Sequence, residues 1–156
     1  MSKGEAPESL VTSPAVWDQR FYAMAQMVAE WSKDPHRRVG AVVVSLDRRR
    51  FSVGYNGFPR RLPDRVDWLQ DEERRRMMST HAERNALDNS TFDTTGCAIY
   101  VTRFPCLECA KGILNKNLGR LIAPKPDFGH DTWGAQWQMA FAMLTTASVG
   151  ITYMGE

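Results

Sequence analysis

The sequence has no long apolar run and few cysteines. None of its hydrophobic stretches approaches the ~18 residues that a membrane-spanning helix needs. Residues 1–13 lack the apolar segment of a signal peptide. Three cysteines are too few for the disulfide framework of a small secreted protein. We therefore expect a cytoplasmic protein that has no membrane partner.

Basic residues are missing from the last part of the chain. All 20 Lys and Arg lie at or before Lys125, and twelve Arg fall between Arg37 and Arg84. The formal net charge of +2 is weak for a protein that binds nucleic acid. The Arg-rich stretch would instead suit a phosphate-bearing small ligand. For any single Arg in it, a solvated surface position is the simpler interpretation.

The 156 residues suffice for one domain with its own core. Residues 1–13 are polar and aperiodic, which predicts a flexible N-terminal arm before a single domain over 14–156. Hydrophobic periodicity predicts an alternation that favours an α/β sheet covered by helices on both faces. The expected helices lie at 14–33, 67–78, 81–87, 106–117 and from 133, and the expected strands at 39–46, 51–53, 97–101, 120–123 and 150–153.

Two short motifs carry the chemistry: His-Ala-Glu at 81–83 and Pro-Cys-Leu-Glu-Cys at 105–109. Zinc prefers tetrahedral nitrogen and sulfur ligands, and a catalytic zinc keeps its fourth position for water. Cys106 and Cys109 share one face of a helix, and a helix opening at Pro105 favours the thiolate of Cys106. We expect His81 and the two cysteines to bind one catalytic Zn²⁺, with Glu83 nearby.

A closed structural zinc site and a coincidence without metal are the alternatives for these motifs. Structural zinc sites usually have four protein ligands. No fourth ligand is evident here, because Cys97 lies in an apolar run and His36 and His130 lie among turn residues.

These motifs resemble the signature of the zinc-dependent cytidine and deoxycytidylate deaminase superfamily. Outside the metal motifs the chain is most similar to the deoxycytidylate (dCMP) deaminases, and the resemblance extends from about Trp17 to Tyr153. Four segments carry this closer similarity: Ser-Lys-Asp-Pro at 32–35, Val-Gly-Ala-Val at 39–42, Gly-Tyr-Asn-Gly-Phe-Pro-Arg at 54–60 and Cys-Ala-Lys at 109–111.

The resemblance implies a cytidine-deaminase-like, three-layer α/β/α sandwich with a five-stranded mixed sheet. Both metal motifs would open helices on the same face of it. The implied reaction is the hydrolysis of dCMP to dUMP and ammonia, which feeds thymidylate synthesis. Regulated members of the family are commonly homohexamers. They respond to dCTP and dTTP, and Mg²⁺ would accompany such a triphosphate effector.

The resemblance also implies roles for residues near the motifs. Asn56 would bind a sugar hydroxyl of the substrate. The loop around it would lie near an effector site, although a plain turn is the alternative; the loop residues are Gly54, Tyr55, Asn56 and Gly57. Three further residues, Ala82, Phe104 and Pro105, would contact the substrate. The backbone near Ala82 would hold the base carbonyl, and Phe104 suits simple packing equally well.

A mechanism follows from these groups. Zinc can lower the pKa of its bound water towards ~7, and the hydroxide would attack C4 of cytosine. Glu83 would take the water proton, deliver it to N3 and later protonate the departing ammonia.

Three other functions compete with this reading. The enzyme could deaminate another free cytosine compound, such as deoxycytidine or dCTP. A polynucleotide cytosine deaminase would need aromatic side chains for base stacking along a continuous basic groove. The small net charge disfavours such a groove. A non-catalytic zinc module would bind the metal and release no ammonia.

Overall fold

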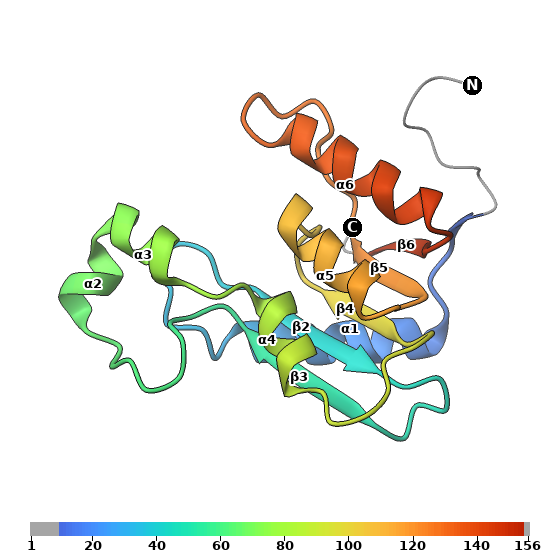
Figure 1. Ribbon diagram of the computed structural model, residues 1–156, viewed down its shortest axis with the longest axis horizontal. Helices are drawn as coiled ribbons and strands as arrows, with labels where there is room; N and C mark the ends of the chain where they lie inside the picture. Colours follow the sequence, from blue (N-terminus) through green and yellow to red (C-terminus); the bar gives the residue numbers. More distant parts are fainter. Residues whose placement is uncertain (1–9, 155–156) are drawn as a thin grey trace.

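A computed structural model describes residues 10–154, and in it a single six-stranded sheet separates two layers of helices (Figure 1). The strand order is β1-β6-β5-β4-β2-β3. The strands are β1 (Val11–Thr12), β2 (Gly40–Val44), β3 (Phe51–Tyr55), β4 (Ala98–Val101), β5 (Arg120–Pro124) and β6 (Gly150–Met154), and the helices are α1 (Val16–Ala29), α2 (Val66–Gln70), α3 (Glu72–Met78), α4 (Ala82–Asn89), α5 (Leu107–Asn115) and α6 (Gly134–Thr146).

The sheet is mixed, as the family resemblance implies. β2 pairs antiparallel with both β3 and β4, and β4, β5, β6 and β1 run parallel to one another. The hairpin expected over 39–53 is therefore confirmed. β2 is a β-branched run buried along its whole length, which is typical of a strand covered on both faces.

The sheet has six strands, so the expected number of five is wrong. Val11 and Thr12, placed by the sequence in a flexible arm, form β1 and pair in parallel with β6. The hydroxyls of Thr12 and Thr152 share a hydrogen bond of 2.8 Å. Two residues are too few to show a strand periodicity. The rest of the expected arm, residues 1–9, lies outside the described residues.

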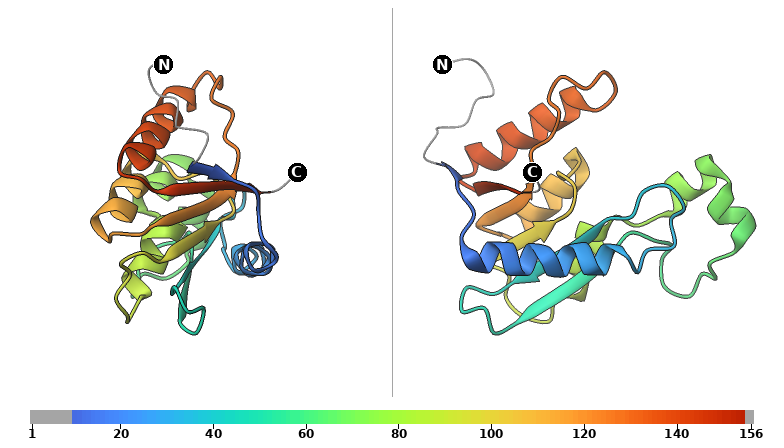
Figure 2. Two further views of the ribbon diagram at one scale, coloured as in Figure 1. Left: turned by 90° about the vertical axis from the view of Figure 1, so that its right-hand side faces the viewer. Right: turned by 180° about the vertical axis from the view of Figure 1, so that it is seen from behind.

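The two helical layers bury different halves of the core, which confirms the three-layer sandwich. Figure 2 (left) shows α1 on one side of the sheet and α4, α5 and α6 on the other. α1 contributes Phe21, Tyr22 and Ala25 to the smaller apolar cluster. Gly40 lets α1 approach β2 closely, because a Cβ there would lie 2.0 Å from the carbonyl oxygen of Ala25. The larger cluster lies under α4–α6.

A buried polar network fixes α1 to the sheet. Asp18, 3% exposed, accepts hydrogen bonds from Arg120 at 3.1 and 2.8 Å and from the hydroxyl of Tyr100 at 2.8 Å. The backbone N–H of Ala15 adds a fourth at 3.1 Å. Burial raises the pKa of Asp18, but these hydrogen bonds outweigh it and leave the pKa below its ordinary value. The carboxylate is thus fully paired.

Two helix predictions need correction. The first helix begins at Val16 after Ala15 rather than at Pro14, and it ends at Ala29. The single helix expected over 67–78 is two helices, α2 and α3, because Asp71 between them is extended and its side chain caps α3.

No helix among residues 10–154 has the length and apolar character to cross a membrane.

The aromatic stripe of the first helix is only partly in the core. The periodicity of this helix favours burial of its aromatic side chains. Phe21 is buried as expected. Trp17 is 43% exposed and Trp31, just beyond the helix, is 49% exposed.

Candidate metal centre

Two helices begin side by side at the metal motifs. His81 is the residue immediately before α4, and Cys106 is the residue immediately before α5. Both have extended backbones, so each helix starts directly after the side chain that its motif supplies. Cys109 follows one turn into α5. α4 and α5 pack against each other and contribute to the same core cluster, which confirms that both motifs open helices on one face of the sheet.

The three candidate ligand atoms converge. The Nδ1 atom of His81 lies 3.3 Å from the sulfur of Cys109 and 3.5 Å from the sulfur of Cys106. All three atoms lie within 4.8 Å of one another. Tetrahedral zinc with ordinary bond lengths separates nitrogen and sulfur ligands by about 3.5 Å. The spacing and the nitrogen–sulfur donor set therefore fit Zn²⁺.

The number of ligands is also informative. Among residues 10–154, no fourth His, Cys, Asp or Glu joins this cluster. Three protein ligands are typical of a catalytic zinc, whereas structural zinc sites usually have four. Cys97, considered above as a spare thiol, is buried in the core cluster instead.

The protein environment shifts the pKa values of the two thiols in opposite directions. A hydrogen bond between the sulfurs lowers the pKa of Cys106 and raises that of Cys109, and His81 lowers the pKa of Cys106 further. The hydrogen bond between His81 and Cys106 in turn raises the pKa of His81. The motif therefore favours a thiolate at Cys106, which is the form that binds metal.

Glu83 lies in the first turn of α4 and is 5% exposed. Burial raises the pKa of its carboxyl, as expected for an acid withdrawn from water. A hydrogen bond with the Cys109 thiol acts in the opposite direction. Glu83 is thus buried beside the candidate ligands, where an acid that exchanges protons with a bound substrate has to lie.

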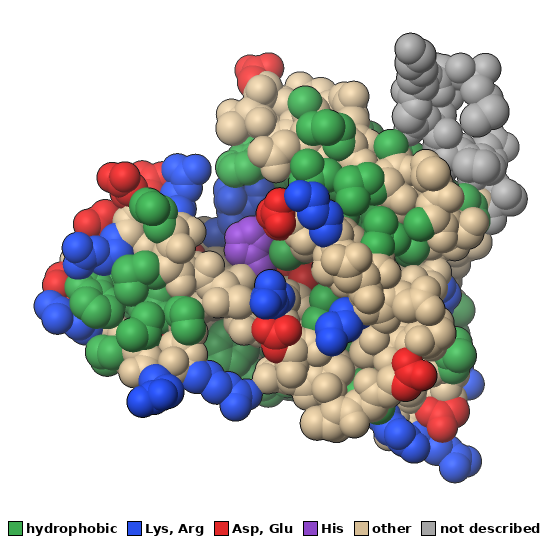
Figure 3. Space-filling model, viewed as in Figure 1, with side chains coloured by type: hydrophobic (Ala, Val, Ile, Leu, Met, Phe, Trp, Pro, Cys, Tyr) green, Lys and Arg blue, Asp and Glu red, His purple; other side chains and the backbone are tan. Residues whose placement is uncertain are grey.

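A cleft of about 520 Å³ opens between α4 and α5 over these residues. His81, Cys106 and Cys109 line it. Figure 3 shows a histidine in a hollow between the α2–α3 segment and the side of α5 and α6, with Lys and Arg side chains around it. A small molecule can therefore reach the candidate ligands from solvent.

Comparison with known proteins agrees with this geometry. Residues 15–124 match the model of the cytidine and deoxycytidylate deaminase zinc-binding region. A deaminase of Aliivibrio fischeri encoded in the luxG 3′ region is 37% identical over 140 residues, 88% of this chain and 93% of the relative. The human deoxycytidylate deaminase is 34% identical over 145 residues, 88% of this chain and 78% of that protein.

The chain belongs to the cytidine and deoxycytidylate deaminase family. The dCMP deaminase of cyanophage S-TIM5, solved with dCMP and dUMP, has the same fold, with a TM-score of 0.73 at 19% identity over 92% of this chain and 100% of that one. This protein is accordingly a hydrolytic deaminase with a zinc-binding site.

Of the four residues expected in an effector loop, Gly54 and Tyr55 form the end of β3, and Asn56 and Gly57 follow it on the way to α2. Gly54 lets the deaminase pack α4 onto β3, because a Cβ there would lie 2.3 Å from the N atom of Ala86. Gly57 forms an isolated bridge with Thr80, with backbone hydrogen bonds of 3.1 and 2.7 Å. The loop thus positions the residue that precedes His81.

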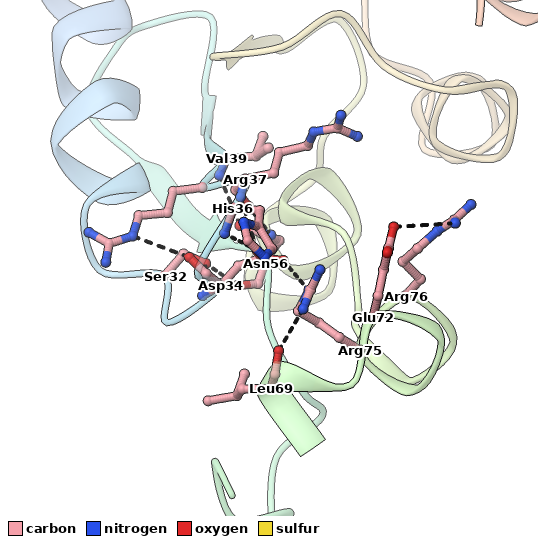
Figure 4. Close-up of polar contacts among 11 residues, drawn as sticks. Ser32, Asp34, His36, Arg37, Val39, Asn56, Leu69, Glu72, Arg75 and Arg76 are labelled. Carbon is pink, nitrogen blue, oxygen red and sulfur yellow. Dashed lines mark hydrogen bonds and ion pairs between the residues drawn. The ribbon is translucent and has the colours of Figure 1, made fainter. Parts of the chain in front are cut away.

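Asn56 is buried and its side chain binds backbone. Its Oδ1 accepts from the N–H of Val39 and its Nδ2 donates to the carbonyl of Arg37, both at 2.8 Å (Figure 4). Its own carbonyl accepts from the Ser32 hydroxyl at 2.8 Å. These bonds tie the α1–β2 loop to the β3–α2 loop. The expected contact of Asn56 with a sugar hydroxyl stays a prediction.

Ala82, Phe104 and Pro105 adjoin the candidate ligands in the chain and are all buried. Phe104 belongs to the large core cluster and meets Phe128 edge to face at 6.4 Å between ring centroids. Its packing role is therefore visible, whereas the substrate contacts expected of these three residues stay predictions.

Arg75 of α3 is a buried cation that no sequence pattern singles out. Arg75 is 6% exposed, its Nε lies 3.6 Å from the carboxylate of Asp34, and it donates to the carbonyl of Leu69 at 2.6 Å (Figure 4). It joins the α2–α3 segment to the α1–β2 loop. Arg75 stands in a run of three Arg that reads as solvated surface, so only the tertiary structure distinguishes it.

Proposed function

We propose that this deaminase converts dCMP to dUMP and ammonia. The observation that carries the proposal is the convergence of one imidazole and two thiols on a single point beside a buried carboxylate. The names of its relatives, which act on deoxycytidylate, support dCMP as the substrate. Residues 14–156 would act as one catalytic domain.

His81, Cys106 and Cys109 would hold the zinc ion. When bound there, zinc supplies a Lewis acid that lowers the pKa of a coordinated water towards ~7. The side chains bring the rest of the chemistry. The buried carboxylate of Glu83 would move a proton to N3 of the base and later to the departing amino nitrogen.

Backbone groups at the two helix starts would orient the base. The first N–H groups of an α-helix have no partner within the helix, and α4 and α5 both begin at the candidate centre. The N–H groups near Ala82 and Cys106 are thus available to the carbonyl oxygen of cytosine. The helix dipoles favour negative charge developing there.

Ammonia release over a panel of substrates tests the proposal. We expect turnover of dCMP to exceed that of deoxycytidine, CMP, dCTP and single-stranded DNA, in protein that contains one zinc per chain. Equal rates on dCMP and deoxycytidine would show that the enzyme does not prefer the nucleotide to the nucleoside. Zinc binding without ammonia release from any compound would identify a non-catalytic module instead.

The same assay with added dCTP or dTTP examines regulation. Effector binding at the loop over 54–57, Mg²⁺ bound with a triphosphate, and a homohexamer stay predictions drawn from the family resemblance. A rate on dCMP that is insensitive to both triphosphates would contradict the effector prediction alone. Sedimentation of the zinc-loaded protein would measure its assembly state.

A further inference from the structure

Arg103 lies two residues beyond the end of β4, three residues before the candidate ligand Cys106. The N–H of Thr102 donates to the carbonyl of Gly40 at 3.0 Å, and the N–H of Gly40 donates to the Thr102 hydroxyl at 3.1 Å. These bonds extend the β2–β4 register by one residue beyond the pair Ala41–Val101. Residue 103 is therefore held close to the start of β2.

The side chain of Arg103 emerges on the face of the sheet that carries the metal motifs. Its guanidinium lies over the Trp137 ring of α6, 5.4 Å from the ring centroid, and Trp137 belongs to the core cluster under α4–α6. Stacking uses the flat face of a guanidinium and leaves its N–H edge free to bind an anion.

That N–H edge has no partner in the protein. Among residues 10–154, no hydrogen bond or ion pair of the Arg103 guanidinium is present, although the residue is partly buried. Burial lowers the pKa of Arg103, and the charge of Arg37 lowers it further, whereas Glu83 and Cys106 raise it. The guanidinium is thus within electrostatic range of both the metal centre and a second cation.

Arg37 is exposed on the α1–β2 loop. Its side chain extends away from the polar cluster of Asp34 and Asn56 (Figure 4). Two like charges near each other without an acid between them are unfavourable unless an anion joins them.

The other cations of this region are already paired. Lys33 binds Asp64 at 2.9 Å, Arg75 binds Asp34 at 3.6 Å and Arg84 binds Asp88 at 3.0 Å. Within the described part of the chain, the guanidinium groups of Arg103 and Arg37 therefore make no hydrogen bond or ion pair.

We propose that Arg103, assisted by Arg37, binds the phosphate of the substrate nucleotide and so selects the monophosphate over the nucleoside. The inference rests on the proposed deamination of dCMP. Guanidinium N–H groups match the oxygens of a phosphate in a two-pronged arrangement that an ammonium cannot reproduce. Trp137 would fix the plane of this fork before the nucleotide binds, which reduces the conformational entropy lost on binding.

Kinetics of Arg103→Leu on dCMP and on deoxycytidine test the proposal. Leucine keeps an apolar contact with Trp137 and removes the charge. We expect KM for dCMP to rise by about 100-fold with kcat within about threefold, and kcat/KM for deoxycytidine to stay within about threefold. Arg103→Lys should recover only part of the loss.

Arg49→Leu is the matched control, because it removes the same charge from the distant β2–β3 turn and should change neither substrate's kinetics. Arg37→Leu should raise KM for dCMP about fivefold to tenfold, and less when Arg103 is already replaced, because both would bind one phosphate. Zinc content and Tm should be unchanged in each variant.

Four outcomes would overturn the inference. Equal losses on dCMP and deoxycytidine would indicate a purely structural role for Arg103. Unchanged KM for dCMP would remove Arg103 from the phosphate site. A change confined to inhibition by dCTP would place a different phosphate there. Wild-type protein that does not deaminate dCMP would overturn the proposed function, and the inference with it.

Discussion

The two faces of the sheet each bury charged side chains, but they use them differently. On the α1 face, Asp18 is surrounded by the donors of Arg120, Tyr100 and Ala15. On the α4–α6 face, Glu83 is just as buried, and the Arg103 guanidinium has no hydrogen-bond partner within residues 10–154. Fully paired charges hold elements together, whereas unpaired ones remain available to a ligand.

The contrast assigns different consequences to similar substitutions. Removing a charge from the α1 face should lower stability and leave turnover intact. Removing one from the metal face should lower turnover and leave stability nearly intact. The following three changes examine that division, beginning with the largest expected effect.

Glu83→Gln preserves the size of the side chain and removes its ability to carry a proton. We expect kcat for dCMP to fall by about 10²- to 10⁴-fold or more. Zinc content by elemental analysis should match the wild type, and so should Tm. Turnover close to that of the wild type would exclude Glu83 as the proton carrier. The buried acid of the metal face would then have no catalytic role.

Arg120→Leu leaves Asp18 buried with its hydroxyl and backbone donors but without its cation. Breaking a fully buried ion pair costs ~3–5 kcal/mol. The Arg120 side chain is 42% exposed, so water shares the interaction and we expect a loss of about 2–4 kcal/mol in the free energy of unfolding by urea. In the folded fraction, kcat for dCMP should be unchanged. A large fall in kcat at preserved stability would show that the two faces are coupled.

The pH dependence of stability supplies the finest comparison. The folded pKa of Asp18 lies below its unfolded value, so its stabilising effect is complete above the unfolded pKa of ~3.9 and is lost as the pH falls through the folded pKa. Asp18→Asn cannot titrate. Urea unfolding between pH 6 and pH 3 should therefore show the two proteins converging in stability below about pH 4.

Any zinc released by acid affects both proteins alike and cancels in their difference. A difference in unfolding free energy that stays constant across this range would mean that the pKa of Asp18 is the same in the folded and the unfolded protein, against the lowering that its contacts cause.

The metal motifs and most strands could be predicted because their signals are local. Two thiols three residues apart after a proline, and an acid two residues after a histidine, restrict the chemistry without any tertiary information. β2 is likewise a continuous β-branched run. These local signals predicted the ligand convergence and most strands, whereas the mixed sheet and the shared face of the two motif-bearing helices were implied by the family resemblance.

The features that escaped prediction depend on contacts between distant residues. Asp18 meets residues 82 and 102 positions away, and no local pattern indicates such pairing. Arg75 is buried although its neighbours in the Arg run are exposed. Asn56 reads as a ligand-binding side chain in a glycine-rich loop, yet its amide binds the backbone of another loop. The contacts of these three side chains depend on which elements pack against one another, and hydrophobic periodicity in a single sequence does not predict that packing.

The pairing of β1 with β6 has a consequence for synthesis on the ribosome. Thr12 and its partner Thr152 are 140 residues apart in the chain, so β1 cannot pair until β6 has been synthesised. Until then β5 is an edge strand with a row of unpaired N–H and C=O groups. Such an edge is a site at which nascent chains aggregate. This edge therefore closes only after β6 has left the ribosome.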